Sequence, residues 1–463
     1  MRNDLNNVWA PELSYLGGKF AKDSAIVCDD SGRISQITAT SSQAGHQLRN
    51  CALLPGLVNA HSHAFQRVIR GRTEYRSRNS ADSFWTWRDL MYQAANTLTA
   101  DDIYIASRMA FLEMALSGIT AVGEFHYLHH APDGQHYEDP NLIAKEVIRA
   151  AKDVGLRITL LRVAYERAGH NQAANPLQQR FIEDPEIYVN NLRRLKEELA
   201  DDVSVRVGAA PHSVRAVSLD YLKIVNDFAN ETNLPVHMHV AEQPAEVSAC
   251  IEEYGRSPVA LLETEGLLNN RFTAVHAIHV TPKAIAALAE SGAMVCACPT
   301  TERNLGDGVV PADGYYQAGV PVCLGSDSNT QIDLLEDARE LEYHLRLQRQ
   351  ERNVLAPSPD DNRSSLASGL FACATINGSK STGLDARHLE VGAPADFFTV
   401  DLNDPSIAGA SQRDLLSAIV FSLSRSAVKD VVIQGKQIVK DGHHADEEEI
   451  ISHFSALQSR LWG

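Results

Sequence analysis

Two histidines separated by one residue, His61 and His63, follow a run of apolar residues at positions 53–58. The run predicts a buried strand, and residues i and i+2 of a strand point to the same face. Both imidazoles are therefore expected to face one way at the carboxyl end of this strand. Two neutral imidazoles that converge suit a divalent metal ion. Because an isolated His-X-His pattern also arises by chance at strand ends, its interpretation depends on the rest of the chain.

Eight short apolar segments alternate with segments of helical periodicity, which predicts a (β/α)8 TIM-like barrel of the α/β class. One helix is expected at residues 99–117, where Thr99 can cap the first turn and Gly118 follows the last. The strands are expected at residues 53–58, 118–126, 156–165, 205–213, 234–242, 272–280, 292–301 and 320–328.

Polar side chains follow seven of the eight predicted strands. Each of them alone has a structural explanation, such as a histidine bonded to a carbonyl or an aspartate that caps a helix. In a barrel of this kind, however, catalytic groups come from the carboxyl ends of the strands. Because these side chains fall on one edge of one barrel, we predict a metal site there. They include His61, His63, Glu124, His126, Tyr127, His212, Arg215, His239, Glu242, His276, Glu302 and Asp327.

The two ends of the chain contain short β-like segments rather than long helices, among them SAIVCDD, GRISQITA and AVKDVVIQGKQIV. We expect these segments to pair into one small β-sandwich, with the barrel inserted between them. The expected division is residues 1–52 and 385–463 for the small domain and residues 53–384 for the barrel.

The composition excludes some classes of partner. The net charge is -17, from 59 acidic against 42 basic side chains, whereas nucleic-acid binding needs an excess of Lys and Arg. We expect no secretory signal at residues 1–13 and no membrane partner, since no apolar run approaches the roughly 20 residues of a membrane span. Seven scattered cysteines without a Cys-X-X-Cys motif favour a reducing, cytoplasmic location. The sequence does not decide whether the chain forms a homodimer.

The segments PGLVNAHSH, HVAE, VHAIH, LGSDSNT and GAPADF resemble the amidohydrolase superfamily, and the resemblance covers nearly the whole chain. It implies that the metal ligands are His61, His63, His239 and Asp327, and that Glu242 and His276 are the catalytic pair. Binuclear members of that superfamily carry a bridging lysine at the end of the fourth strand. The segment VRVGAAPHS has no lysine, which favours one metal ion. Zn²⁺ is the default ion, and Fe²⁺ accepts the same ligands.

Such a residue set suits deamination. A divalent ion held by three imidazoles and one carboxylate lowers the pKa of its water to about 7. Asp327 can accept a proton as well as bind the ion, and His276 can stabilise the oxygen of a tetrahedral carbon. Glu242 can protonate the nitrogen that leaves, which is needed because an amide anion is too basic to be a leaving group. We therefore expect hydrolysis of a C=N group with release of ammonia.

Two arginines near the expected site favour a small substrate with carboxylates, which Arg binds in bidentate fashion. The segments HSHAFQR, SFWTWRDLMY, EFHYLHH, APHSVRAV and CPTTERNLGDG resemble the formimidoylglutamate deiminase family of histidine degradation. That family hydrolyses N-formimino-L-glutamate to N-formyl-L-glutamate and ammonia. The resemblance implies that the substrate is bound by Gln66, Arg88, Tyr127, His212 and Arg215, with the two arginines on its carboxylates.

Three alternatives remain at this level. The first is a deaminase of guanine or of a thioether nucleoside such as S-adenosylhomocysteine on the same scaffold. Arg88 and Arg215 argue against it, because a nucleobase offers no carboxylates. The second is a non-catalytic interaction scaffold, which the complete set of six polar residues argues against. The third is a cyclic-amide hydrolase, which the missing lysine disfavours.

Overall fold

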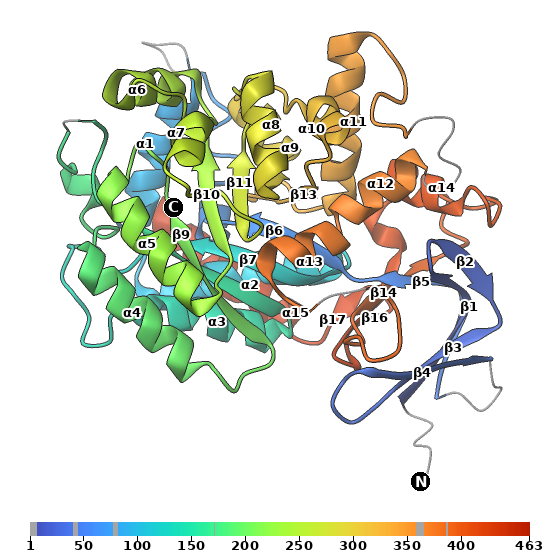
Figure 1. Cartoon of the computed structure of the whole chain (residues 1–463). Helices are drawn as coiled ribbons and strands as arrows, with labels where there is room; N and C mark the ends of the chain where they lie inside the picture. Colours follow the sequence, from blue (N-terminus) through green and yellow to red (C-terminus); the bar gives the residue numbers. More distant parts are fainter. Residues whose placement is uncertain (1–6, 40–44, 77–81, 171, 358–364, 386–387) are drawn as a thin grey trace.

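Two sheets organise the chain in the computed structural model, which describes all residues except 1–6, 40–44, 77–81, 171, 358–364 and 386–387 (Figure 1). One sheet has eight parallel strands, and the other has nine strands drawn from both ends of the chain, counted over the described residues. The predicted barrel and the predicted small β domain built from both chain ends are therefore confirmed.

The eight parallel strands pair in the order in which they occur in the chain. The edges of this sheet meet at its carboxyl end, where Ser62 and Asp327 form a parallel bridge. There the backbone N–H of His63 donates to the Asp327 carbonyl (2.9 Å), and that of Asp327 donates to the His61 carbonyl (3.0 Å). The seam of the barrel thus lies at predicted site residues. The strands are β6 (Leu57–Ser62), β7 (Ile119–His126), β8 (Arg157–Ala164), β9 (Val205–Pro211), β10 (Val236–Val240), β11 (Phe272–His276), β12 (Met294–Ala297) and β13 (Val322–Leu324).

Helices cover the outside of the barrel (Figure 1). The predicted helix at 99–117 is α2, whose first turn is capped by Thr99 as Asp102 N–H donates to the threonine hydroxyl. The other helices that follow barrel strands are α3 (Leu142–Val154), α4 (Pro185–Glu198), α5 (Leu219–Thr232), α6 (Pro244–Tyr254), α7 (Pro258–Thr264), α8 (Pro282–Ser291), α9 (Pro299–Leu305), α10 (Ala312–Ala318), α11 (Leu334–Arg349), α12 (Leu366–Cys373) and α13 (Ile376–Thr382), with α2 spanning Ala100–Leu116.

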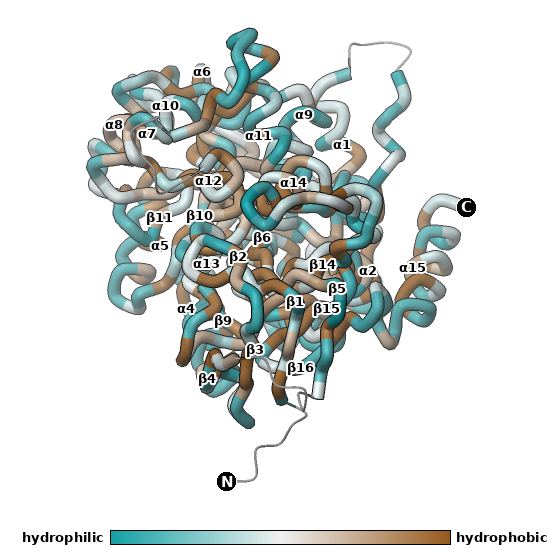
Figure 2. Tube along the Cα trace, turned by 90° about the vertical axis from the view of Figure 1, so that its right-hand side faces the viewer, coloured by the Kyte–Doolittle hydropathy of each residue, from teal (hydrophilic) through white to brown (hydrophobic). Residues whose placement is uncertain are grey.

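The strands of the barrel have no exposed face, because helices pack outside and side chains fill the interior. Every residue of β6, β7 and β8 is buried. Hydrophobic segments accordingly gather toward the middle of the molecule, and hydrophilic segments toward its outer loops and helices (Figure 2). Among the described residues, no helix is long and apolar enough to cross a membrane.

The nine-stranded mixed sheet is held together by β5, which pairs with strands from both chain ends. Leu53 in β5 lies opposite Ser14 on one side and opposite Thr399 on the other. Two helices accompany this part of the chain, α14 (Leu415–Ser422) and α15 (Glu447–Trp462), and α15 packs against α2. The strands are β1 (Val8–Leu16), β2 (Lys19–Lys22), β3 (Ser24–Cys28), β4 (Ile34–Ala39), β5 (His46–Pro55), β14 (Phe397–Asp401), β15 (Val428–Ile433), β16 (Lys436–Lys440) and β17 (His443–His444).

The strand predicted at residues 53–58 is wrong as a single element. Its first three residues belong to β5 of the mixed sheet, and the barrel strand β6 begins only at Leu57. The chain crosses between the sheets at Gly56, where a Cβ would clash with the Thr120 side chain. One apolar run can serve two buried strands, and periodicity does not distinguish these cases. Strand β5 of the mixed sheet extends past residue 52. The domain boundaries at residues 52 and 384 stay predictions.

The long connection at residues 64–98 contains two short helices, η2 (Ala64–Ile69) and α1 (Phe84–Ala95), which pack on each other. A third short helix, η3 (Pro176–Gln178), follows β8 and also packs against α1. These three segments bring further side chains to the carboxyl end of the barrel.

Candidate metal centre

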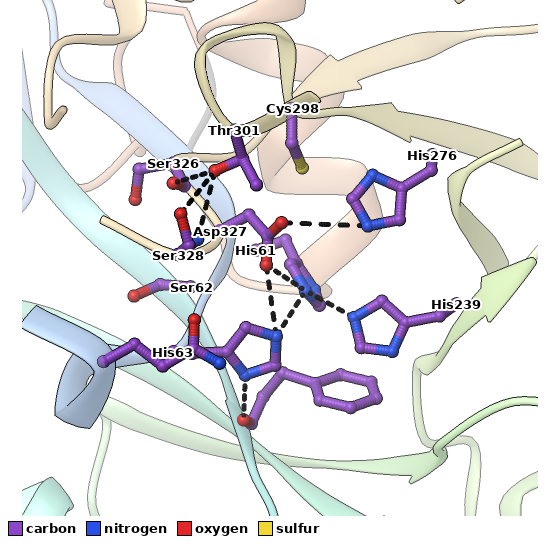
Figure 3. Close-up of polar contacts among 12 residues, drawn as sticks. His61, Ser62, His63, His239, His276, Cys298, Thr301, Ser326, Asp327 and Ser328 are labelled. Carbon is purple, nitrogen blue, oxygen red and sulfur yellow. Dashed lines mark hydrogen bonds and ion pairs between the residues drawn. The ribbon is translucent and has the colours of Figure 1, made fainter. Parts of the chain in front are cut away.

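Four predicted ligands meet at the carboxyl end of the barrel (Figure 3). His61 and His63 come from β6 and the residue after it, His239 from β10, and Asp327 from the segment after β13. Their ligand atoms all lie within 4.8 Å of one another. His63 Nε2 lies 3.2 Å and His61 Nε2 3.5 Å from Asp327 Oδ1. All four residues are buried.

The orientation of the imidazoles suits a cation. The Nδ1–H of His63 donates to the Phe125 carbonyl (2.9 Å), and that of His239 donates to the His212 carbonyl (3.2 Å). These bonds leave each Nε2 with a free lone pair. The Nε2 atoms of both residues lie 3.2 Å from His61 Nε2, and burial lowers the pKa of His61 to about 3. Three imidazole nitrogens and one carboxylate therefore face a common point, which fits a divalent metal ion.

Left-handed backbone conformations orient several residues of the site. His276 has φ +68°, Asp327 φ +46° and Ala241, which precedes Glu242, φ +51°. Such conformations cost on the order of 1–3 kcal/mol in residues other than glycine and cluster at functional sites. The turn after His239 is fixed by Glu246, whose carboxylate accepts the N–H groups of Ala241 (3.0 Å) and Glu242 (3.2 Å).

Glu242 and His276 form the second layer of the site. His276 Nε2 lies 3.8 Å from Glu242 Oε1 and 3.7 Å from Asp327 Oδ2, while its Nδ1–H donates to Glu302 Oε1 (3.1 Å). Burial raises the pKa of Glu242 to about 7. Burial lowers the pKa of His276, but Glu242, Glu302 and Asp327 outweigh it and raise that pKa to about 10. The pair thus combines a carboxyl group that can exchange a proton near neutral pH with an imidazolium that keeps its proton there.

The five predicted substrate residues line one cavity, which also reaches His63, His239, Glu242, His276 and Asp327. Gln66 Nε2 donates to the Tyr127 hydroxyl (3.0 Å). Two buried polar atoms on the cavity residues, Gln66 Oε1 and Arg88 Nε, have no hydrogen-bond partner among the described residues. A buried polar atom without a partner is costly, so these atoms suit a polar ligand. The five residues are Gln66, Arg88, Tyr127, His212 and Arg215.

Two further polar residues of the barrel strands lie outside this cavity. His237 lies deeper in the barrel, with Nε2 3.0 Å from both the carbonyl and the hydroxyl oxygen of Ser381. Glu124 accepts the backbone N–H of Ala64 (2.6 Å), and burial raises its pKa to about 8. These contacts give both residues a structural explanation.

Several residues of the site were given no role from the sequence. Tyr92 and Tyr165 line the cavity, and Glu302 holds His276. Tyr165 directly follows β8, the one predicted strand whose end had no polar candidate, so its phenol was the available signal. Cys298 lies beside His276 and Asp327, with its sulfur within 4.8 Å of their ligand atoms (Figure 3).

The barrel and its cluster define a class of protein: (β/α)8 hydrolases that work with a metal ion at the carboxyl end of the strands. The amidohydrolase family profile matches residues 52–438. The chain belongs to the amidohydrolase family, which confirms the resemblance stated above.

Similar proteins span the whole chain. The formimidoylglutamate deiminase of Pseudomonas aeruginosa is 37% identical over 97% of this chain and 98% of its own. The 5-methylthioadenosine/S-adenosylhomocysteine deaminase of Haloarcula marismortui is 28% identical, over 97% of this chain and 99% of its own. The crystal structure of an amidohydrolase from Brucella melitensis is 34% identical with a TM-score of 0.91, covering 99% and 100% of the two chains. The chain is thus a hydrolase with deaminases among its relatives.

Proposed function

We propose that the chain hydrolyses N-formimino-L-glutamate to N-formyl-L-glutamate and ammonia, a step of histidine degradation. The observation that carries this proposal is the position of Arg88 and Arg215 on the wall of the cavity that three of the four candidate metal ligands also line. Arginine binds carboxylates in bidentate fashion, and this substrate carries two of them beside its C=N group. The Pseudomonas aeruginosa relative supports the same substrate.

We assign His61, His63, His239 and Asp327 as ligands of one divalent ion, with Zn²⁺ as the default and Fe²⁺ as the alternative. When bound, such an ion supplies a nucleophile by lowering the pKa of water to about 7. The segment at the end of β9 contributes no lysine, which supports one ion rather than two.

We assign the proton transfers of the reaction and the stabilisation of its oxygen to Glu242, His276 and Asp327. Addition of water to the formimino carbon gives a tetrahedral carbon with one oxygen and two nitrogens. The protonated carboxyl of Glu242 gives its proton to the terminal nitrogen as water adds. The proton that Asp327 takes from the water then converts the resulting amino group to an ammonium group, the C–N bond breaks, ammonia leaves, and the hydroxyl proton returns to Glu242. His276 Nε2–H stabilises the oxygen that becomes the formyl carbonyl. Asp327 Oδ2, which lies 3.7 Å from His276 Nε2, accepts the proton that water gives up.

The remaining cavity residues hold the substrate. Arg88 and Arg215 bind the two carboxylates, while Gln66 and Tyr127, already bonded to each other, orient the formimino group. His212, whose ring lies 4.9 Å from that of His239, separates the carboxylate side from the metal side. In this arrangement the reacting carbon lies next to Glu242 and His276.

A second candidate is a nucleoside deaminase, which the Haloarcula marismortui relative supports. The aromatic side chains of Phe84, Trp87 and Tyr92 on the cavity wall favour it, because aromatic rings stack on nucleobases. The two arginines disfavour it, since a neutral nucleoside leaves both guanidinium groups without an anion.

An ammonia-release assay separates these candidates. The purified protein is given formiminoglutamate, S-adenosylhomocysteine and guanine at equal concentrations, and the rate of ammonia release is measured for each. We expect kcat/KM for formiminoglutamate to exceed the others by at least about 1,000-fold, which two charge-assisted contacts can supply. Release from S-adenosylhomocysteine alone would overturn the proposal and favour the nucleoside deaminase.

A further inference from the structure

Three buried polar side chains meet at the cavity, whose wall includes two of them, Tyr92 and Tyr165. The hydroxyl oxygens of Tyr92 and Tyr165 lie 3.1 Å apart. Gln178 Nε2 donates to the Tyr165 hydroxyl (2.9 Å) and to the Tyr92 hydroxyl (3.3 Å). All three residues are at most 3% exposed. They come from three separate elements, α1, the end of β8 and η3, so we name them the hydroxyl cluster.

The hydroxyl cluster lies next to both arginines of the cavity. Arg88 precedes Tyr92 by one turn of α1, and its guanidinium carbon lies 5.4 Å from the centre of the Tyr92 ring. Arg215 lines the same cavity as Tyr165, and the Tyr165 phenol acts electrostatically on its guanidinium. The ring of Tyr165 also packs edge-on against His212, with centroids 4.8 Å apart. The cluster therefore touches three of the five residues assigned to the substrate.

The same cluster fixes the helix that carries Arg88. Helix α1 belongs to the long connection after β6, not to the regular ring of helices. Its carboxyl end is tied to the η3 segment, because Asn96 Nδ2 donates to the Leu177 carbonyl (2.9 Å) and Arg180 Nη1 to the Leu98 carbonyl (2.8 Å). Inside the cavity, α1 is tied to the barrel by the bond between the two tyrosine hydroxyls and by the contact of the Tyr127 hydroxyl with Met91 Sδ (3.4 Å). A buried network whose members are bonded to one another is rigid.

We propose that the hydroxyl cluster is a spacer that sets the distance between Arg88 and Arg215, and that it makes the site select dicarboxylates whose carboxylates are three carbons apart. This inference rests on the proposed function, because the glutamate moiety has that spacing. Two arginines on long side chains can adapt to several chain lengths and repel each other when no ligand is present. Selectivity for length therefore needs a rigid support, which the cluster supplies.

Binding of inert dicarboxylates tests the spacer. Dissociation constants of glutarate and of succinate, which is one carbon shorter, are measured by calorimetry on the metal-loaded protein. We expect the wild type to prefer glutarate by at least 10-fold and Tyr165→Phe to lose most of that preference. The substitution keeps the ring and removes only the hydroxyl. Tyr92→Phe serves as a second variant, since it keeps the ring beneath Arg88, and it should behave in the same way.

Tyr221→Phe is the matched control. Its hydroxyl is equally buried and donates to the Glu183 carbonyl (3.2 Å), but it lies outside the cavity. This variant should keep the wild-type ratio. An unchanged glutarate-to-succinate ratio in both cluster variants, or a wild type that binds the two acids equally or binds neither, would overturn the inference.

The test separates the spacer from the proposed reaction, because glutarate and succinate are not turned over. A wild type that prefers glutarate but releases no ammonia from formiminoglutamate keeps the spacer and loses the proposed function. With active enzyme, Tyr165→Phe should raise KM for formiminoglutamate about 10-fold and change kcat less than twofold. A fall in kcat with KM unchanged would contradict a role in spacing.

Discussion

At the scale of single residues, the proton balance of the proposed reaction depends on Glu242. Its carboxyl lies half-buried beside His276 and is not among the four candidate ligands. Glu242→Gln should keep the metal content and lower kcat by about 100-fold or more, because it removes proton transfer and little else. Ammonia release and elemental analysis together check this result. Glu252→Gln, on the exposed face of α6, is the control. Full activity of Glu242→Gln would remove Glu242 from its assigned role.

Arg215 is assigned to a substrate carboxylate, so its effect should depend on that carboxylate. Arg215→Met should raise KM for formiminoglutamate by about 10- to 100-fold, the loss of one charge-assisted contact. The loss on a truncated amidine without carboxylates should be much smaller. Steady-state kinetics on both substrates measure the difference. Equal losses would mean that Arg215 supports the structure of the cavity instead.

The sequence predicted some of these residues better than others. His61 and His63 were predicted together because the strand period of two puts them on one face. Tyr165 was not singled out, since the sequence does not distinguish a tyrosine at the end of an apolar strand from a tyrosine of the hydrophobic core. The role of Glu302 was also missed. Its bond to His276 joins helix α9 to the end of β11, and only the folded barrel brings the two side chains within 3.1 Å.

At the scale of elements, the seam between β6 and β13 positions the metal site. Gly325 lies on that seam, where an added Cβ would be 2.8 Å from both Cβ and the carbonyl oxygen of His61. Gly325→Ala should therefore push the strands apart, cost about 1–3 kcal/mol of stability and lower the metal content. Gly369→Ala in α12 is the control, because its Cβ meets only Tyr316 at 3.8 Å. Melting temperature and metal analysis check both variants. Normal metal content in Gly325→Ala would contradict this role of the seam.

Elements were predicted where one signal dominated. The barrel strands are continuous apolar runs bounded by polar residues, and α2 has a clear cap at Thr99. The switch from β5 to β6 at Gly56 was not predicted, since both strands are buried and apolar. Helix α1 was treated as part of a long connection. Its position depends on contacts with η2 and η3, which the sequence does not reveal.

At the scale of the whole molecule, stability in acid should depend on a buried ion pair outside the site. Arg162 Nη2 donates to Glu183 Oε1 (2.9 Å), and Asn191 Nδ2 donates to the same oxygen (2.7 Å). Burial raises the pKa of Glu183, but His129 and Arg162 outweigh burial and lower it from 4.5 to about 2. The folded-state pKa is thus below the unfolded value. The contribution is present above pH 4.5 and is lost as the pH falls toward 2.

A shift of this size corresponds to about 3 kcal/mol. Glu183→Gln should be less stable than the wild type at pH 7 and should lose part of the decline in stability between pH 5 and pH 3. Urea unfolding of the metal-free protein at several pH values measures the decline. Glu197→Gln, on the exposed face of α4, should retain it. Identical slopes for Glu183→Gln and the wild type would show that the ion pair does not control acid stability.

The composition and the alternation of elements sufficed to predict the fold class and the joining of both chain ends. The seven scattered cysteines are all buried free thiols. The cytoplasmic location and the homodimer stay predictions, because neither depends on contacts within one chain. Substrate choice also required knowledge of which side chains share one cavity, and that follows only from the closed barrel.

The central claim is that His61, His63, His239 and Asp327 together hold one metal ion. Elemental analysis of the purified protein, alongside a His239→Ala variant, tests it most directly. We expect about one divalent ion per chain in the wild type and much less than one in the variant. Two ions per chain in the wild type, or an unchanged content after loss of His239, would contradict the claim.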